Sequence, residues 1–281
     1  MPSRLRSLLT RDPLASTCGA SLLGLVVINN DDPWLFVGVA AICLVVLPRR
    51  GLLTHPLLWA GLFVGVGLRQ LATWHTIDDH AIAATYWCGA LALGLGTTRP
   101  DRTLAASARY IVGTLFAFAA GWKLLSGQFA DGTFFRYSLL FDDRFETVAD
   151  VVGGTSDSAR REGVASVSQL LFGTGRGVAR VDEGTRNEAV ALTFTWWGLV
   201  IETAVAVTFL APLRERWGWV RHATLVAFAG TTYLVVPIGG FGTLLLVLGA
   251  AMVTTDRARL AYYTGAAALL VWSGLWPLVF T

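Results

Sequence analysis

The sequence predicts an all-α, polytopic integral membrane protein, a helical bundle with about nine transmembrane helices. Hydrophobic residues make up 54% of the 281 residues and charged residues only 15%, whereas charged residues usually account for about a quarter of a soluble domain. The mean hydropathy is +0.57. Several segments approach the roughly 20 apolar residues that cross a bilayer, and polar breaks separate them.

Nine apolar segments are the candidate helices. In order, they cover residues 13–28, 33–47, 52–70, 81–97, 104–125, 188–212, 219–236, 239–254 and 259–280. Arginines precede the first segment, as in a signal peptide, but no small-residue cleavage pattern precedes the polar residues 29–32. We therefore expect an uncleaved first span. The first two helices are short, which fits either a tilted pair or a packed hairpin.

Arginine-rich stretches alternate with acidic or neutral ones between these helices. The basic stretches contain Arg4, Arg6 and Arg11, then Arg49 and Arg50, Arg99 and Arg102, Arg214, Arg216 and Arg221, and finally Arg257 and Arg259. Basic loops stay on the cytoplasmic side of a membrane. The alternation therefore predicts a multi-pass protein of the cell membrane with its amino terminus inside and its carboxyl terminus outside. Because the arginines orient helices, the net charge of +3 does not indicate nucleic-acid binding, and no nucleic-acid motif accompanies it.

The segment 126–187 is longer than a connector between helices needs to be. Its first half alternates aromatic and charged residues, which suits the headgroup layer better than the bilayer interior. Ser156 or Asp157 is placed to cap a short helix with Val164, Val167, Leu170 and Leu171 on one face. We expect this segment to form a lid on the extracytoplasmic side of a single membrane domain that covers residues 1–281. Within it, residues 173–177 resemble a phosphate loop but lack its Lys-Ser/Thr ending and its preceding strand, which favours an ordinary loop.

Lys123 is the one lysine among the 22 basic residues, and it lies at the end of the apolar run Phe116–Leu125. A cation at that depth must extend to the interface, pair with a carboxylate or lose its proton. Two interpretations therefore remain open, an interfacial anchor and a functional lysine. The orientation rule places Lys123 on the outer side, together with Arg69 and His80.

Glu202 is the one carboxylate within a strongly apolar stretch. Ionisation without compensation would cost several kcal/mol there, so Glu202 should be protonated, hydrogen-bonded to a neighbouring helix, or paired with a cation such as Arg109. Structural stabilisation is the simplest role. His222 opens the seventh helix, where it either bonds a partner helix or lies at the inner interface.

The cysteines and histidines do not form a metal site. Cys18, Cys43 and Cys88 lie inside predicted helices without a CxxC pair, and we interpret them as packing residues. The four histidines are too scattered for metal-ligand spacing. The sequence predicts no metal cofactor.

Four motifs, taken in order, resemble the membrane portion of vitamin K-dependent gamma-carboxylase and its prokaryotic relatives, the HTTM group. They are Asp79–Ile82 before an apolar helix, Arg109–Leu124 with Phe129 and Gly132, Trp197–Glu202, and His222 with Ile238–Phe241. The second is similar to the group's pattern of an aromatic residue, Ala-Gly, a lysine, an aromatic residue and a glycine. The similarity covers about residues 75–245, an HTTM-like core.

The resemblance implies a quinol-dependent carboxylase or epoxidase, a carbon–carbon lyase that uses reduced vitamin K or menaquinol. It implies that Lys123 is the base and His80 its catalytic partner. Quinone contacts are then expected from Tyr110, Trp122, Phe129 and Trp197, and support from Glu202, Arg109 and His222. Burial in an apolar site favours the free amine that such a base needs. The expected partners are membrane lipids, the quinone, and a secreted or membrane protein substrate.

The sequence also departs from the carboxylase pattern. The carboxylase has two adjacent lysines where this chain has Lys123 and Leu124, Asp79 replaces an asparagine, and the soluble carboxyl-terminal domains have no counterpart. The alternative is therefore a non-catalytic membrane protein that binds a quinone or lipid, or a subunit of a membrane complex. An arginine at position 123 separates the two hypotheses, because only the enzyme needs the amine. Transport is disfavoured by the lack of paired broken helices.

Overall fold

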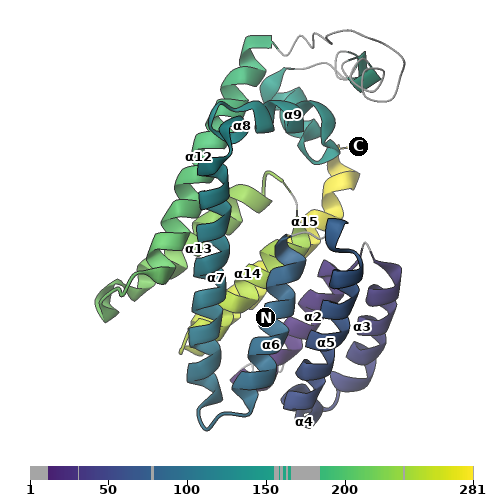
Figure 1. Cartoon of the computed structure of the whole chain (residues 1–281), viewed down its shortest axis with the longest axis vertical. Coiled ribbons are helices and arrows are strands. Elements are labelled where there is room, and N and C mark those ends of the chain that lie inside the picture. The colour runs from purple at the N-terminus through teal and green to yellow at the C-terminus, as the bar shows by residue number, and fades with distance from the viewer. Residues whose placement is uncertain are drawn as a thin grey trace.

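The computed structural model describes residues 12–30, 32–76, 79–154, 158, 161–162, 164–165, 184–236 and 238–280. These residues form helices and short connections, and no strand occurs among them. The predicted all-α class is therefore confirmed (Figure 1).

Each of the nine predicted segments corresponds to a long helix in the described part of the chain. These helices are α2 (Pro13–Ile28), α3 (Pro33–Val46), α5 (Pro56–Ala72), α6 (Asp79–Leu95), α7 (Pro100–Leu125), α12 (Gly184–Leu210), α13 (Gly218–Tyr233), α14 (Gly239–Met252) and α15 (Asp256–Phe280). Proline opens α2, α3, α5 and α7, where its missing N–H costs nothing. Short helical turns complete the connections, namely α4 (Arg50–Leu53), η1 (Trp74–Thr76) and η4 (Glu215–Trp217).

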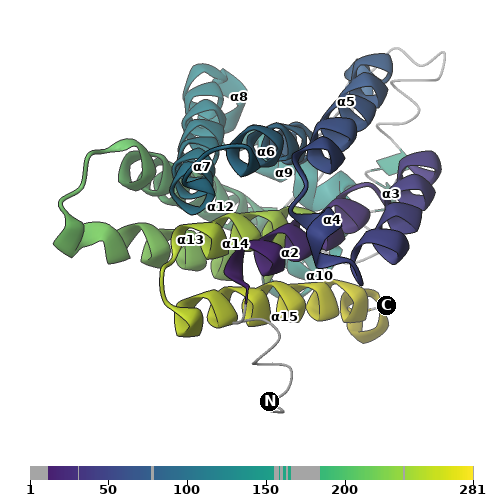
Figure 2. The same ribbon diagram turned by 90° about the horizontal axis from the view of Figure 1, so that it is seen from below.

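The long helices pack around α14, in which every residue from Gly242 to Ala250 is buried. Helices α2, α7, α13 and α15 all contact α14, and Figures 1 and 2 show it crossing the interior behind α7 and α6. Helix α7 lies beside α12, and α5 beside α6. The interior of this bundle is one continuous apolar cluster.

Glycines bring several of these helices close together. A Cβ atom on Gly113 would lie 2.7 Å from Leu210, and one on Gly249 would lie 2.3 Å from Tyr262. Gly61 and Gly65, which have the spacing of a helix-packing motif, face open space instead, with no described atom within 4 Å of an added Cβ. Close approach thus depends on glycines of α7 and α14, not on that motif in α5.

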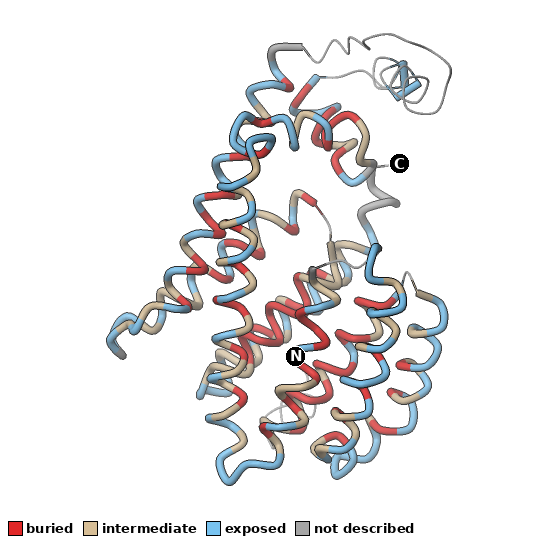
Figure 3. The backbone as a smooth tube through the Cα atoms, viewed as in Figure 1, coloured by how far each residue is buried: buried red, intermediate tan, exposed pale blue. Residues whose placement is uncertain are grey.

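Within the described residues, two helices are long and apolar enough to cross a membrane, Pro100–Leu125 and Arg186–Leu210. Five further apolar helices have 10 to 17 residues. Large apolar side chains nevertheless lie exposed on the outer helices, and much of α3 and α5 carries the exposed colour in Figure 3. Helix α3 has no charged residue and buries only Val39, Cys43 and Val46.

The first part of segment 126–187 forms a compact helical cap that joins one end of α7 to α12 (Figure 1). We call residues 126–154 the cap. It contains α8 (Gly127–Ala130), α9 (Thr133–Phe141), η2 (Asp143–Phe145), α10 (Glu146–Val148) and the π-helical turn η3 (Ala149–Gly153). Of the predicted lid helix, Val164 is described, whereas Ser156, Asp157, Val167, Leu170, Leu171 and residues 173–177 lie outside the described residues.

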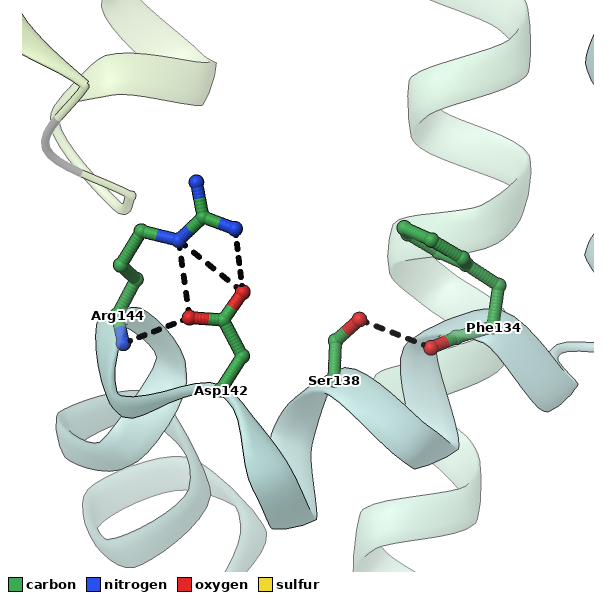
Figure 4. Close-up of polar contacts among 4 residues, drawn as sticks. All are labelled: Phe134, Ser138, Asp142 and Arg144. Atoms are coloured by element: carbon green, nitrogen blue, oxygen red, sulfur yellow. Dashed lines mark hydrogen bonds and ion pairs between the residues drawn. The ribbon is translucent and has the colours of Figure 1, made fainter. Parts of the chain in front are cut away.

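Polar contacts stabilise the cap locally. The Arg144 guanidinium donates to both carboxylate oxygens of Asp142, and the Ser138 hydroxyl donates to the Phe134 carbonyl at 2.9 Å (Figure 4). Arg136 pairs with Glu188 at the start of α12. Gly132 has a φ of +82°, and an added Cβ would lie 3.1 Å from Leu192, so this turn both needs a glycine and seats the cap on α12.

Candidate functional site

The centre of the candidate site is an ion pair between Lys123 of α7 and Glu202 of α12. The Lys123 ammonium donates to Glu202 Oε1, and the two side chains are 23% and 11% exposed. The two residues are 79 positions apart in the sequence. Of the three possibilities expected for Glu202 (protonated, hydrogen-bonded to a neighbouring helix, or paired with a cation), the structure shows the pair with a cation. That cation is Lys123, not Arg109.

The pair lies well inside the length of α12. Glu202 follows Arg186 by 16 residues and precedes Leu210 by eight, which correspond to about 24 Å and 12 Å of helix. The side chain of a helical residue points back toward the helix amino terminus. The Lys123 amine therefore reaches into the bundle instead of extending outward from the end of α7.

An aromatic cluster covers the pair on the cap side. The Lys123 Nζ atom lies 4.8 Å from the centre of the Phe129 ring, a distance at which a cation is attracted to the ring face. Phe129 is 4% exposed and contacts Phe134 and Phe135. Phe135 in turn contacts Phe194 of α12. The cluster thus separates the ion pair from water at the cap end.

Two buried polar atoms, one in α12 and one in α13, have no hydrogen-bond partner among the described residues. They are Glu202 Oε2 and the hydroxyl of Tyr233 in α13. Tyr233 is 2% exposed, and its ring contacts those of Phe228 and Phe241. An orphaned buried polar group costs about 1–3 kcal/mol, so such atoms identify places where a ligand or water completes the structure.

His80 lies at the start of α6 and contacts Phe241 of α14. Its ring is 5.7 Å from that of Phe241, and the Phe241 ring is 6.0 Å from that of Tyr233. One aromatic ring thus separates His80 from Tyr233. The contact with Phe241 of α14 thus joins His80 to the bundle core.

Arg109 lies at the far end of α7 from Lys123 and stabilises the end of α12. Its Nε atom donates to the Phe209 carbonyl at 2.6 Å and its Nη2 atom to the Ala211 carbonyl at 2.9 Å. Arg221 of α13 donates to the carbonyls of Thr208 and Ala211 as well. The two guanidinium groups satisfy carbonyls left free at the helix end and complement its negative dipole.

Three of the four expected quinone contacts lie away from the ion pair. Tyr110 is 13 residues before Lys123, about 20 Å along α7, and Trp122 is 75% exposed. The indole of Trp197, itself 45% exposed, donates to Thr231 at 3.2 Å. Of the four, Phe129 is the residue that contacts Lys123.

His222 bonds a partner helix, one of the two possibilities that its position allowed. Its Nδ1 atom lies 2.7 Å from the Tyr262 hydroxyl of α15. His222 thereby joins α13 to α15 in a contact separate from the Lys123–Glu202 pair.

The described residues contain no group of three or more His, Cys, Asp or Glu side chains that could hold a metal ion. Cys18, Cys43 and Cys88 are buried thiols, in agreement with a packing role. The site therefore consists of an ion pair and an aromatic cover.

Sequence reasoning missed Tyr233. A tyrosine in an apolar helix resembles any core aromatic residue, and only the absence of a partner for its hydroxyl sets it apart. Searches of family models, curated proteins and solved structures found no match to this chain. The resemblance to the carboxylase group accordingly rests on the four sequence motifs.

Proposed function

We propose that this chain is a multi-pass membrane protein whose Lys123–Glu202 pair performs acid–base chemistry on a reduced quinone. Membrane insertion is supported by α7 and α12, which are long and apolar enough to span, and by the exposed apolar surface of α3. A face of this kind is stable against lipid and unfavourable against water. In the proposed topology all nine long helices cross the membrane and the cap faces outward.

The observation that carries the chemical proposal is the burial of the pair beneath Phe129. In an apolar site both charges lose their hydration, so transfer of one proton from the Lys123 ammonium to the Glu202 carboxylate costs less there than it would in water. The transfer leaves a neutral amine and a carboxylic acid. Lys123 can then accept the proton of a hydroquinone O–H, and the regenerated ammonium lies beside the oxygen that has become negative.

The other residues have supporting roles in this proposal. Phe129 shields the amine from water at the cap end, and His80 is proposed as the catalytic partner on the basis of the sequence resemblance. Arg109 holds the end of α12 that places Glu202. The reaction class is that of the gamma-carboxylase group, with a vitamin K or menaquinone type of quinol and a carboxyl acceptor on a protein.

The test compares the wild type with Lys123→Arg. Arginine retains the positive charge for Glu202 but is not deprotonated in proteins. Purified protein is incubated with reduced menaquinone or vitamin K, oxygen and bicarbonate, and quinone epoxide is measured. We expect epoxide from the wild type and a loss of at least about 100-fold in Lys123→Arg, the range that a general base contributes.

Equal epoxide from both proteins would refute the role of Lys123 as the base. Quinone binding, measured separately by quenching of tryptophan fluorescence, distinguishes the causes of a negative result. No epoxide from either protein, with equal quinone binding, would support a non-catalytic function.

A second candidate is such a non-catalytic quinone- or lipid-binding protein, or a subunit of a membrane complex. The observation that favours it is that Lys123 and Glu202 already form an ion pair with each other. A pair of this kind can serve as a structural link between α7 and α12, and an arginine at position 123 would preserve that link.

A further inference from the structure

We infer that Arg109 of α7 and Arg221 of α13 form a second binding site, which takes a phosphate group, and that the headgroup of an anionic phospholipid supplies this phosphate. The two arginines meet at the end of α12 that is remote from the cap (Figure 1). The inference rests on the proposed membrane insertion but not on the quinol chemistry proposed for Lys123.

The two guanidinium groups converge on one carbonyl oxygen. Arg109 Nη2 and Arg221 Nη2 lie 2.9 Å and 3.1 Å from the carbonyl oxygen of Ala211, so these two nitrogens are no more than about 6 Å apart. The Nε atoms donate to the carbonyls of Phe209 and Thr208 at 2.6 Å and 2.8 Å. The backbone of α12 therefore holds both cationic groups in fixed positions beside each other.

The charges of these two arginines are not balanced within the described part of the chain. Both residues are half-buried, and all their hydrogen bonds to described residues are accepted by backbone carbonyls. The end of α12 supplies the equivalent of about half a negative charge, which leaves more than one positive charge without compensation. Like charges repel more strongly where water is partly excluded. A bound anion would remove that repulsion.

Both guanidinium groups also have hydrogen-bond donors to spare. An arginine has five N–H donors, whereas Arg109 makes three hydrogen bonds to carbonyls and Arg221 makes two. The planar fork of an arginine matches the oxygens of a phosphate, with two parallel N–H···O bonds. Two adjacent forks with free donors are thus suited to a single phosphate group.

The surroundings favour a lipid headgroup over a soluble phosphate. The Arg109 Cζ atom lies 5.6 Å from the centre of the Tyr110 ring, and Trp217 and Trp219 follow the end of α12. All three aromatic side chains are exposed, and exposed tyrosine and tryptophan are typical of the headgroup layer. Basic pockets between transmembrane helices on the cytoplasmic side bind anionic headgroups. This is the side on which the arginine pattern places the loop between α12 and α13.

Arg259 provides a matched control on the same predicted side of the membrane. Its Nη2 atom donates to the Val253 carbonyl at the end of α14 at 2.9 Å, as Arg109 does at the end of α12. Its Nη1 atom, however, pairs with the Asp256 carboxylate at 3.1 Å. Arg259→Gln therefore removes the same charge from a position that already has its own anion.

The test measures the binding of individual lipids to the purified protein in detergent by native mass spectrometry. The probes are dioleoyl phosphatidylglycerol, which is anionic, and dioleoyl phosphatidylcholine, which has the same chains and no net charge. We expect the wild type to bind phosphatidylglycerol about tenfold more tightly, as one charge-assisted hydrogen bond allows. Arg109→Gln and Arg221→Gln keep an N–H donor for the carbonyls, and each should remove this preference. Arg259→Gln should retain it.

Equal affinity of the wild type for the two lipids would overturn the assignment to a lipid, and this comparison needs no variant that could fail to fold. A preference lost equally in Arg259→Gln would overturn it as well, because the preference would then come from the overall positive charge. Inorganic phosphate identifies the other source. Thermal stabilisation by inorganic phosphate that requires both arginines, without a lipid preference, would assign the site to a soluble phosphate. Absence of both effects would overturn the phosphate site itself.

The outcomes also separate this inference from the proposed function. A phosphatidylglycerol preference that depends on Arg109 and Arg221, without epoxide formation, would support the inference and count against the catalytic function. Epoxide formation that depends on Lys123, without any effect of phosphatidylglycerol or phosphate, would support the function and refute the inference.

Discussion

Lys123 differs from the 21 arginines of the chain in one property that matters at its position. A lysine can act as a general base through its free amine, whereas an arginine is not deprotonated in proteins. Arginines serve the structural tasks elsewhere: Arg109 and Arg221 bond helix-end carbonyls, and Arg69, Arg136 and Arg144 pair with carboxylates. The only lysine is paired with the buried carboxylate of Glu202. This pairing is the reason for assigning Lys123 a chemical role.

A cycle of substitutions separates the structural from the chemical contribution of this pair. Lys123→Met leaves Glu202 buried without compensation and should lower the free energy of unfolding by about 3 kcal/mol. Lys123→Met/Glu202→Leu removes both charges and should restore stability to within about 1 kcal/mol of the wild type, because apolar residues often replace a buried pair without loss. Unfolding is followed by tryptophan fluorescence in detergent.

The double variant should remain inactive although it is stable, since it has no base. A single Lys123→Met variant as stable as the wild type would contradict the burial of the pair. A double variant that retains quinol turnover would place the base elsewhere.

At the scale of the helices, the sequence was most informative about where each helix begins. The starts of α2, α3, α5 and α7 follow from proline at the first turn, and the Asp12 and Asp32 side chains accept backbone N–H groups where α2 and α3 begin. Such signals are local, so they can be recognised without knowledge of the fold. The ion pair between Lys123 and Glu202 could not be derived in the same way, because it depends on how α7 packs against α12. Whether the Tyr233 hydroxyl finds a hydrogen-bond partner likewise depends on how three helices pack together, which no local signal reveals.

The contact between α3 and α5 gives a pH dependence that can be measured. Asp32 begins α3, and Arg69 in the last turn of α5 donates to it at 2.6 Å. The Arg69 hydrogen bond, followed by the backbone bonds from Leu35 and Trp34, lowers the pKa of Asp32 below its ordinary value of 3.8. Because the folded-state pKa is the lower one, the stabilisation is complete above the ordinary value and disappears as the pH falls through the folded-state pKa.

Asp32→Asn keeps a good helix cap and removes the charge. The variant should be less stable than the wild type at pH 7 by at most about 1 kcal/mol, as expected for a partly exposed pair, and the difference should shrink as the pH falls below 3.8. Thermal unfolding of both proteins at pH 7 and near pH 3 measures the stability difference at each pH. A difference that is the same at both pH values would mean that the Arg69 pairing contributes nothing.

At the scale of the whole molecule, α12 connects the two ends of the bundle. Its first turns pack against the cap through Ala191 and Phe194, and its last carbonyls are held by arginines from α7 and α13. Glu202 lies between these anchored ends, so its position relative to Lys123 is set by the entire length of the helix. The cap and the inner loops must then lie on opposite sides of the membrane if α7 and α12 both cross it.

Cysteine labelling tests this arrangement directly. The native cysteines are buried, so single cysteines at exposed positions can report which side of the membrane they occupy. Positions Asp150 in the cap, Arg102 near the start of α7 and Arg257 near the start of α15 are exposed. The positive-inside rule places the two arginines in the cytoplasm and the cap outside.

A membrane-impermeant maleimide applied to intact cells should therefore label Asp150→Cys, while Arg102→Cys and Arg257→Cys should react only after permeabilisation. Labelling of all three in intact cells would exclude this topology, and protection of Asp150→Cys with labelling of the other two would invert it. In the inverted case the Lys123 site would be covered from the cytoplasmic side, and a secreted protein substrate would have no access to the cap.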